Sequence, residues 1–172
     1  MRIETLVEDI YFTLENKHKL SEDNLSSFLK GMEKAVRDSI ENERDQKARP
    51  YLRMSSIGKP LRRLWMEFKK PQKDVQHKGS MLIKFLYGSI LEELLIFLTK
   101  EAGHSVTDEQ KEVTLNGVKG HIDCKIDGEV VDVKSASDFS FRKFKFGTLE
   151  NDDPFGYIGQ ISGYAMAEGK NR

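Results

Sequence analysis

The dipeptide Asp127-Gly128 constrains the fold more than any other feature of this chain, because it separates two runs of alternating apolar and polar residues. Both central residues of a type I′ turn need a positive φ angle, which Asp and Gly tolerate. The pattern therefore predicts a β-hairpin with a two-residue turn, formed by strands at about 118–126 and 129–135. A further strand is expected at about 105–115.

The register expected for this hairpin brings two acids and a lysine to one face. Counted outward from the turn, Asp123 lies opposite Asp132, and His121 lies opposite Lys134. Because side chains alternate along a strand, these four residues share a face. The opposite face is apolar and consists of Ile122, Cys124, Ile126, Val131 and Val133.

Two directly opposed carboxylates have Cβ atoms only about 4.5–5.5 Å apart and repel each other unless a cation lies between them. Mg²⁺ takes oxygen ligands and commonly binds through one or two carboxylates together with substrate phosphate. Lys134 would then orient or deprotonate a metal-bound water, or stabilise charge on the phosphate. A surface hairpin whose charges merely neutralise one another has the same pattern, so the spacing leaves both interpretations open.

Helical patterns flank the strands. Residues 1–48 are charged, and their apolar residues recur at helical spacing after Ser21, which suits a helix N-cap, so we expect a helical N-terminal arm. A long, very apolar helix is expected from about Ser80 to Ala102, with Gly103 ending it and with a central place in the fold. After the hairpin we expect a polar and aromatic loop, then a last helix from about Asp153-Pro154. The predicted class is α+β, with an arm at 1–48 and one core domain at 49–172.

A basic and aromatic segment precedes the long helix, in SSIGKPLRRLWMEFKKPQK at residues 55–73. Trp65 and Phe68 lie among its cations, and this mixture suits phosphates and stacked bases. A solvated helix face anchored by a core tryptophan would have the same composition. The stretch contains a single acid, and its cations are Lys59, Arg62, Arg63, Lys69, Lys70 and Lys73.

Composition limits the other classes of site. The 28 basic residues balance the 28 acidic ones, so any nucleic-acid contact must come from a local patch. One cysteine cannot form a disulfide framework, and the four histidines lack zinc-ligand spacing, so we expect no zinc and a reducing, cytoplasmic setting. No run reaches the roughly 18 apolar residues of a membrane span.

Three motifs in this order resemble those of the PD-(D/E)XK nuclease superfamily, in its RecB-like branch. They are GHID at residues 120–123, VVDVKS at 130–135 and QISGY at 160–164, which resemble G-h-x-D, D-h-K and Q-x-x-x-Y. The resemblance implies a restriction-endonuclease-like core, in which helices flank a central, mainly antiparallel sheet. Residues 80–169 match the order of that core up to its second helix.

The resemblance also implies roles for individual residues. Asp123 and Asp132 would bind Mg²⁺ or Mn²⁺, and Lys134 would be the catalytic lysine. Gln160 and Tyr164 would face DNA or the site. An acid on the first core helix would add a further metal ligand, and Glu92 suits its spacing, although Glu93 remains open.

Two more expectations concern the ends of the core. The stretch from Ser55 to Trp65 resembles an upstream segment of phage-type members that helps hold a DNA end. Arg62 or Arg63 would be the phosphate contact, and Lys59 would also bind DNA. Family members with an iron–sulfur cluster use four cysteines, so no cluster is expected. The chain stops after the Q-x-x-x-Y helix, where the family adds a final strand. We therefore expect one of three situations. The chain is truncated, an upstream element substitutes for the missing strand, or a second chain covers the open sheet edge. That second chain would be another copy or a different polypeptide.

The expected activity is hydrolysis of DNA phosphodiester bonds by a metal-dependent nuclease. An exonuclease of the kind that phages use in DNA replication, recombination or host-DNA degradation fits best, in the cytoplasm of a host. The alternative is a non-catalytic DNA-binding or assembly subunit of the same fold that works beside a partner chain. A third interpretation is a scaffold whose hairpin charges are incidental.

Overall fold

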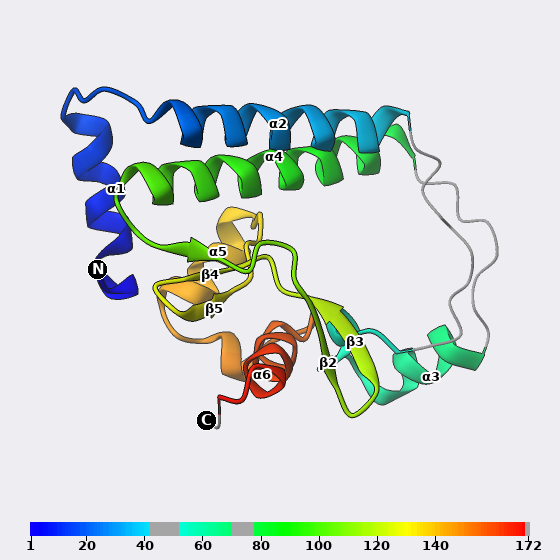
Figure 1. Ribbon diagram of the computed structural model, residues 1–172. Coiled ribbons are helices and arrows are strands. Elements are labelled where there is room, and N and C mark those ends of the chain that lie inside the picture. The colour runs from blue at the N-terminus through cyan, green and yellow to red at the C-terminus, as the bar shows by residue number, and fades with distance from the viewer. Residues whose placement is uncertain (42–51, 70–77, 171–172) are drawn as a thin grey trace. The chain divides into compact units, whose positions relative to one another are not determined.

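The computed structural model describes residues 1–41, 52–69 and 78–170, and within them the chain is a mixed α/β protein with small antiparallel sheets (Figure 1). The helices are α1 (Leu6–Glu15), α2 (Glu22–Ile40), α3 (Leu61–Lys69), α4 (Gly79–Glu101), α5 (Asp138–Lys145) and α6 (Tyr157–Ala167). The strands are β1 (Val106–Thr107), β2 (Glu112–Leu115), β3 (Val118–His121), β4 (Cys124–Ile126) and β5 (Glu129–Val131). Short 3₁₀ turns span Ile3–Thr5, Met54–Ser56 and Leu149–Asn151.

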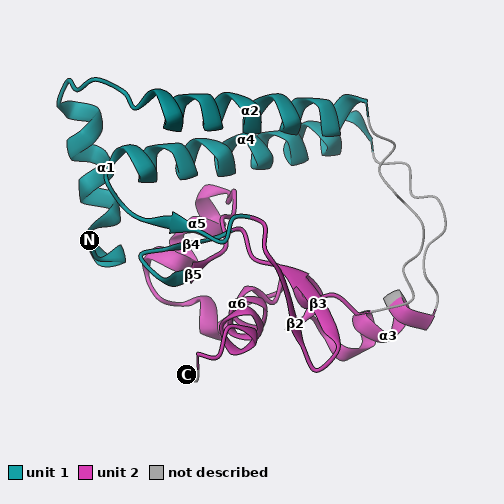
Figure 2. Cartoon of the chain, viewed as in Figure 1, with its two compact units in different colours: residues 1–45, 76–109, 124–129 teal, residues 46–75, 110–123, 130–172 magenta. Residues whose placement is uncertain are grey.

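The chain divides into two compact units, coloured separately in Figure 2. Unit 1 comprises residues 1–45, 76–109 and 124–129, and unit 2 comprises residues 46–75, 110–123 and 130–172. The chain therefore passes from unit 2 into unit 1 after Asp123 and returns at Val130. The predicted boundary between residues 48 and 49 lies outside the described residues, as do the predicted basic residues Lys70 and Lys73.

In unit 1, α2 packs lengthwise against α4, and the rings of Phe28 and Phe97 stack across them with centroids 4.9 Å apart (Figure 1). Ser21 caps α2 by accepting a hydrogen bond from the backbone N–H of Asn24, as predicted. The prediction that α4 is central is met only in its second half, since Ile83 and Tyr87 are more than half exposed. None of the helices in the described ranges is long and apolar enough to cross a bilayer.

The C-terminus of α4 is closed by a glycine turn, which confirms the predicted end at Gly103. Gly103 has φ +87°, its N–H donates to the carbonyl of Lys100, and the N–H of His104 donates to the carbonyl of Thr99. This pair of bonds is a Schellman motif. The motif places His104 directly after the helix, with a fully buried side chain.

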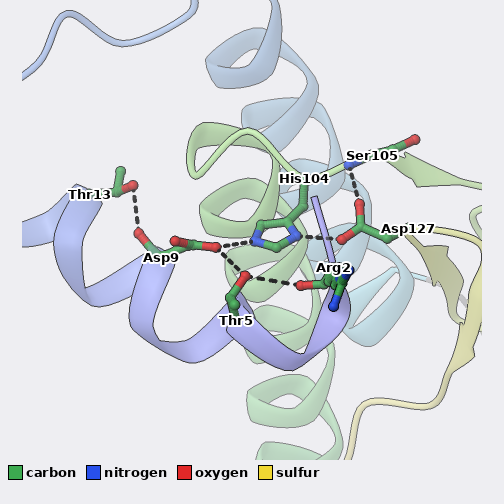
Figure 3. A network of polar contacts seen from close by, with 7 residues as sticks. All are labelled: Arg2, Thr5, Asp9, Thr13, His104, Ser105 and Asp127. Carbon is green, nitrogen blue, oxygen red and sulfur yellow. Dashed lines mark hydrogen bonds and ion pairs between the residues drawn. The ribbon is translucent and has the colours of Figure 1, made fainter.

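His104 lies between two carboxylates of unit 1 (Figure 3). Its Nδ1 is 2.6 Å from Asp127 Oδ2, and its Nε2 is 3.2 Å from Asp9 Oδ2. Both contacts are hydrogen bonds only when the ring carries two protons, because a neutral imidazole has one N–H. Asp127 also accepts from the backbone N–H of Ser105 through Oδ1 at 3.0 Å. The network ties α1 and the end of α4 to the hairpin turn.

We expect Asp127→Asn to lower the urea midpoint of unfolding at neutral pH. The hydrogen bond from His104 holds the pKa of Asp127 below its usual value, against the opposing effect of burial. A depressed folded pKa contributes stability above the usual aspartate pKa of about 3.9, and this contribution is lost as the pH falls through the lower, folded value. The difference between variant and wild type should therefore shrink in acid. Asn keeps the turn, because Asn-Gly also favours type I′.

Asp38→Asn is the matched control for Asp127→Asn, since Asp38 is a half-exposed acid of unit 1 that pairs with Lys34 at 3.4 Å. Exposed pairs of this kind contribute about 0.3–0.5 kcal/mol at most. Equal midpoints for Asp127→Asn and Asp38→Asn at neutral pH would contradict a stabilising role for the network.

The predicted turn is confirmed, since Asp127 and Gly128 have φ +50° and +86°. β4 and β5 flank it in a three-stranded sheet of order β1-β4-β5, where Val106 pairs with Ile126. The predicted inward face of β4 is also confirmed, because Cys124 and Ile126 are buried.

The expected strand lengths are wrong. The run at 105–115 is interrupted where Asp108 and Gln110 have φ +54° and +52°, which gives two strands, β1 and β2. The run at 118–126 is divided at residues 122–123 into β3 and β4, and β5 ends at Val131. The expected loop after the hairpin is also wrong, since it contains α5, capped by the Ser137 hydroxyl, which accepts from the N–H of Ser140.

Unit 2 is built around a small buried cluster in which β2, β3, α6 and the Met54–Ser56 turn meet. The fully buried or nearly buried members are Met54, Val113, Ile122 and Tyr164. Gly120 lies beneath two of them, because a Cβ there would come within 2.6 Å of Met54 and 2.7 Å of the Tyr164 ring. The glycine of the GHID motif is thus required by packing.

Candidate functional site

The candidate site lies in unit 2, where the two segments that follow β3 and β5 meet α6. Asp123 follows β3 directly, and Asp132 and Lys134 follow β5. None of the three lies within a strand as the structure assigns them, although the hairpin was expected to extend that far. They nevertheless interact, since Asp132 and Lys134 are both electrostatic partners of Asp123.

His121 does not join this group, so its predicted pairing with Lys134 is wrong. It pairs with Glu112 in the β2–β3 hairpin, and its Nε2 lies 3.9 Å from a carboxylate oxygen of that residue. The N–H of Ile122 donates to the carbonyl of Lys111, so the pairing with the β2 side of the chain continues past His121. The strand carrying His121 therefore has β2 as its partner.

Asp123 is held by the backbone that follows β5. Its Oδ2 accepts a hydrogen bond from the N–H of Val133 at 2.6 Å. Burial, and next the charge of Asp132, raise the pKa of Asp123, and the Val133 N–H and Lys134 only partly offset them. Asp123 is therefore a carboxylate whose negative charge is only partly compensated by its neighbours.

Asp132 has a partner on each oxygen. Lys134 Nζ lies 2.7 Å from its Oδ2, and Gln160 Nε2 donates to its Oδ1 at 3.0 Å. Burial lowers the pKa of Lys134, but the hydrogen bond and charge of Asp132 outweigh it, so the net pKa is raised. Lys134 is accordingly a fixed cation beside the acids, and a role as a base is disfavoured.

Gln160 and Tyr164 lie one turn apart on α6 and are both buried. The Gln160 amide donates to Asp132 and to the Tyr164 hydroxyl, the latter at 3.1 Å, so both of its N–H groups have acceptors. Burial raises the pKa of Tyr164 and keeps its hydroxyl protonated. Gln160 and Tyr164 were expected to face DNA or the site. The structure brings Gln160 to the site, where it contacts Asp132.

The acid predicted on the long helix lies in the other unit. Glu92 and Glu93 belong to α4 in unit 1, so the site is described from unit 2 alone. Glu93 lies over Gly31 of α2, where a Cβ would come within 1.9 Å of its carboxylate. Burial raises the pKa of Glu93, and the charge of Glu109 adds to this. The packing of Glu93 against α2 is a structural reason for Gly31.

The predicted phosphate-binding segment packs onto α6 through glycines. The Cβ positions of Gly156 and Gly159 would lie 2.7 and 2.8 Å from backbone atoms of Gly58, so side chains there are excluded. Gly58 itself has φ +89°. Lys59, whose Nζ lies 3.4 Å from the Ser56 hydroxyl, is thus joined to the same helix that holds Asp132 through Gln160.

The helix α3 that follows carries three of the predicted cations, Arg62, Arg63 and Lys69. Arg62 and Arg63 are exposed, and Trp65 is 55% exposed. The alternative of a core tryptophan is therefore wrong. Lys69 lies over the Phe68 ring, with its Nζ 5.6 Å from the centroid. Trp65 and these cations are thus exposed on the same helix.

We expect Gly159→Ala to destabilise unit 2 by about 1–3 kcal/mol, because the new methyl meets backbone that cannot rotate away. Helix propensity acts in the opposite direction, since Ala in a helix interior is favoured over Gly by about 1 kcal/mol. Urea unfolding measures the difference. Ser162→Ala, at an exposed position of the same helix, is the control and should be close to neutral. A Gly159→Ala variant more stable than wild type would show that the glycine contact does not form.

Within the described ranges, no three histidine, cysteine, aspartate or glutamate side chains gather closely enough to hold a metal ion alone. The donor set in unit 2 is two carboxylates. It suits a hard cation such as Mg²⁺, which keeps several waters and takes its remaining ligands from substrate phosphate. Cys124 is buried and forms no disulfide.

Comparisons of the chain with protein-family models, with curated proteins and with solved structures found no match. The features that point to a function are therefore the motifs and the geometry of unit 2.

Proposed function

We propose that this protein is a metal-dependent deoxyribonuclease of the PD-(D/E)XK superfamily, and that unit 2 carries its catalytic residues. The observation that supports this most is the cluster of Asp123, Asp132 and Lys134, with Lys134 Nζ 2.7 Å from Asp132. The proposal extends to an exonuclease of the RecB-like branch that acts in phage-type DNA replication, recombination or degradation.

Asp123 and Asp132 of unit 2 would hold Mg²⁺ or Mn²⁺. The further acid that the family resemblance implies, Glu92 or Glu93, belongs to α4 of unit 1. Each carboxylate oxygen has two lone-pair directions, so the existing hydrogen bonds leave room for a metal. When bound, such an ion polarises a phosphate and lowers the pKa of a coordinated water. The ion would also offset the two causes that raise the pKa of Asp123, which are burial and the charge of Asp132.

The remaining residues would orient the metal-binding carboxylates and neutralise charge on the phosphate. Lys134, a cation in place beside Asp132, would offset the charge that develops on the scissile phosphate. Gln160 fixes the Asp132 carboxylate through a hydrogen bond of 3.0 Å, and it is itself oriented by the Tyr164 hydroxyl. These two buried residues are positioning residues of the site.

DNA would be bound by the segment from Lys59 through α3. Arg62 and Arg63 offer exposed guanidinium groups for phosphates, and Trp65 offers a ring for a base. Contacts of this kind make affinity fall steeply with salt. The Gly58 contacts with α6 would transmit this binding to the site.

One experiment tests the proposal as a whole. End-labelled linear DNA and covalently closed DNA are incubated with the full chain, in Mg²⁺ and in chelator. We expect loss of the linear DNA in Mg²⁺ alone, while the closed circles persist. Cleavage of closed circles would support a nuclease but contradict an exonuclease. If linear and closed DNA both stay intact in Mg²⁺ and in Mn²⁺, the proposed catalytic activity is contradicted.

A second candidate is a non-catalytic DNA-binding or assembly subunit of the same fold. It is favoured by the state of Asp132, whose two oxygens already have protein partners. In this case labelled DNA is retained in a binding assay without cleavage under any metal condition. The partner would then be the chain that completes the nuclease, either a second copy or another polypeptide.

A further inference from the structure

Three aromatic rings of unit 2 form a continuous row. The Tyr157 ring is in the middle, with the Phe155 ring centroid 5.4 Å away at 26° and the Phe144 centroid 5.8 Å away at 36°. Phe144 and Phe155 are 43% and 54% exposed. Rings with this exposure are only partly explained by packing within the chain, since buried aromatic clusters lose most of their surface to neighbours.

The row lies beside the candidate site. The Tyr157 hydroxyl interacts electrostatically with Lys134 and Asp132. Tyr157 also begins α6, three residues before Gln160, so the two side chains share one side of the helix. Since Gln160 donates to Asp132, the ring row and the acids are linked through one turn of α6.

The helix that contributes Phe144 to the row is basic. α5 carries three bases and one acid. Arg142 pairs with Asp138 at 3.0 Å, and Lys143 pairs with Asp152. Lys145, at the end of the helix, is exposed. Exposed rings interleaved with cations match a polyanion that also carries flat faces.

We propose that the row of Phe144, Tyr157 and Phe155 stacks the unpaired bases of a single-stranded nucleic acid next to Lys134 and Asp132. Bases in a duplex are already stacked on each other, so the row selects a strand with free bases. For its catalytic meaning the inference rests on the proposed function, because it assigns the substrate strand of that site. Strand binding itself requires no cleavage.

The test is fluorescence anisotropy in chelator, with labelled oligodeoxythymidine and a duplex of equal length as probes. The double variant Phe144→Leu with Phe155→Leu should bind the single strand about ten-fold more weakly or worse, since one stacked base contributes about 1–3 kcal/mol and about 1.4 kcal/mol is ten-fold. Duplex affinity should stay within about two-fold of the wild type. The double variant Phe139→Leu with Phe141→Leu, also exposed on α5 but outside the row, is the control and should keep its single-strand affinity.

Phe155→Trp separates stacking from folding, because it keeps a flat ring and should bind the single strand at least as tightly as wild type. Unchanged single-strand affinity in the Phe144 and Phe155 double variant, or an equal loss in the control, overturns the inference. The inference is also overturned if sedimentation velocity shows a dimer that the row variants abolish while they still bind the single strand. A second copy of the chain would then be what covers the row. If strand binding depends on the rings but no cleavage occurs in Mg²⁺, the inference is supported. Only the proposed nuclease activity is then contradicted.

Discussion

Asp123→Asn should stabilise unit 2 and Asp132→Asn should destabilise it, while each variant loses metal-dependent DNA cleavage by about 100-fold or more. The two acids are equivalent in the proposed chemistry, so both losses of activity are expected. They differ in what surrounds them, and the opposite signs in stability follow from that difference.

Asp123 is a partly buried carboxylate next to another one, and these two causes raise its pKa. A raised folded pKa of an acid means that its ionised form destabilises the fold at neutral pH, and that this penalty disappears as the pH falls below the usual value of about 3.9. Removing the charge should add about 0.5–2 kcal/mol at neutral pH. The amide oxygen of Asn can still accept from the N–H of Val133.

Asp132 has the opposite balance, since its charge is compensated. Asp132→Asn removes the ion pair with Lys134 at 2.7 Å and leaves that ammonium, which is two-thirds buried, with only its interaction with Asp123. Leaving a partly buried charge unpaired costs about 1–3 kcal/mol.

Urea unfolding in chelator at neutral pH measures both effects on stability, and gel assays with linear DNA and Mg²⁺ measure cleavage. Glu112→Gln is the control, because Glu112 is an exposed acid of β2 that pairs with Lys119 at 2.8 Å. It should change neither quantity by much. Equal effects of the two Asp variants on stability would contradict the assignment of a compensated and an uncompensated acid.

Lys134→Ala should lower the rate of DNA cleavage by about 10²–10⁴-fold, the usual range for a group that acts only in the transition state. The loss should appear in the rate at saturating DNA, because Lys134 is two-thirds buried beside Asp132 and contributes little surface for DNA binding. Single-turnover assays with labelled linear DNA separate the rate from affinity. Lys134→Arg retains the positive charge and should restore part of the rate.

Lys119→Ala is the matched control for Lys134→Ala, since it also removes an ion-paired lysine of unit 2, here an exposed one of β3. Its cleavage rate should match the wild type. Wild-type cleavage by Lys134→Ala would remove Lys134 from the mechanism, and an equal loss in Lys119→Ala would attribute the effect to net charge.

The features that could be predicted from the sequence depend on local chemistry. The Asp127-Gly128 turn has two positive φ angles, Ser21 caps α2, and Gly103 ends α4, as expected. Each of these features is determined within about four residues, so a single sequence contains the whole signal.

The features that could not be predicted depend on contacts between distant residues or on unusual backbone. Positive φ at Asp108 and Gln110 interrupts a run that alternates like one strand, and no pattern announces it. α5 was expected as a loop although its signals were present, namely Ser137 as a cap and bases in the last turn. Its three phenylalanines, Phe139, Phe141 and Phe144, are spaced by two and three residues and obscured the helical period.

The site was predicted in part. The motifs identified Asp132 and Gln160, but their hydrogen bond joins residues 28 positions apart, and only the fold of unit 2 brings them together. The ring row of Phe144, Tyr157 and Phe155 was missed, because its members come from two helices and the turn between them. The sequence signal for the ring row is the group of aromatic residues downstream of Lys134.

Calorimetric titration of the full chain with Mn²⁺ tests the central claim most directly, since the claim is that Asp123 and Asp132 share a divalent ion. The wild type should bind Mn²⁺ with an affinity that Asp123→Asn and Asp132→Asn each weaken by at least about ten-fold, whereas Glu112→Gln leaves it unchanged. Saturable Mn²⁺ binding of equal strength in all four proteins, or none in the wild type even with DNA present, would contradict the account.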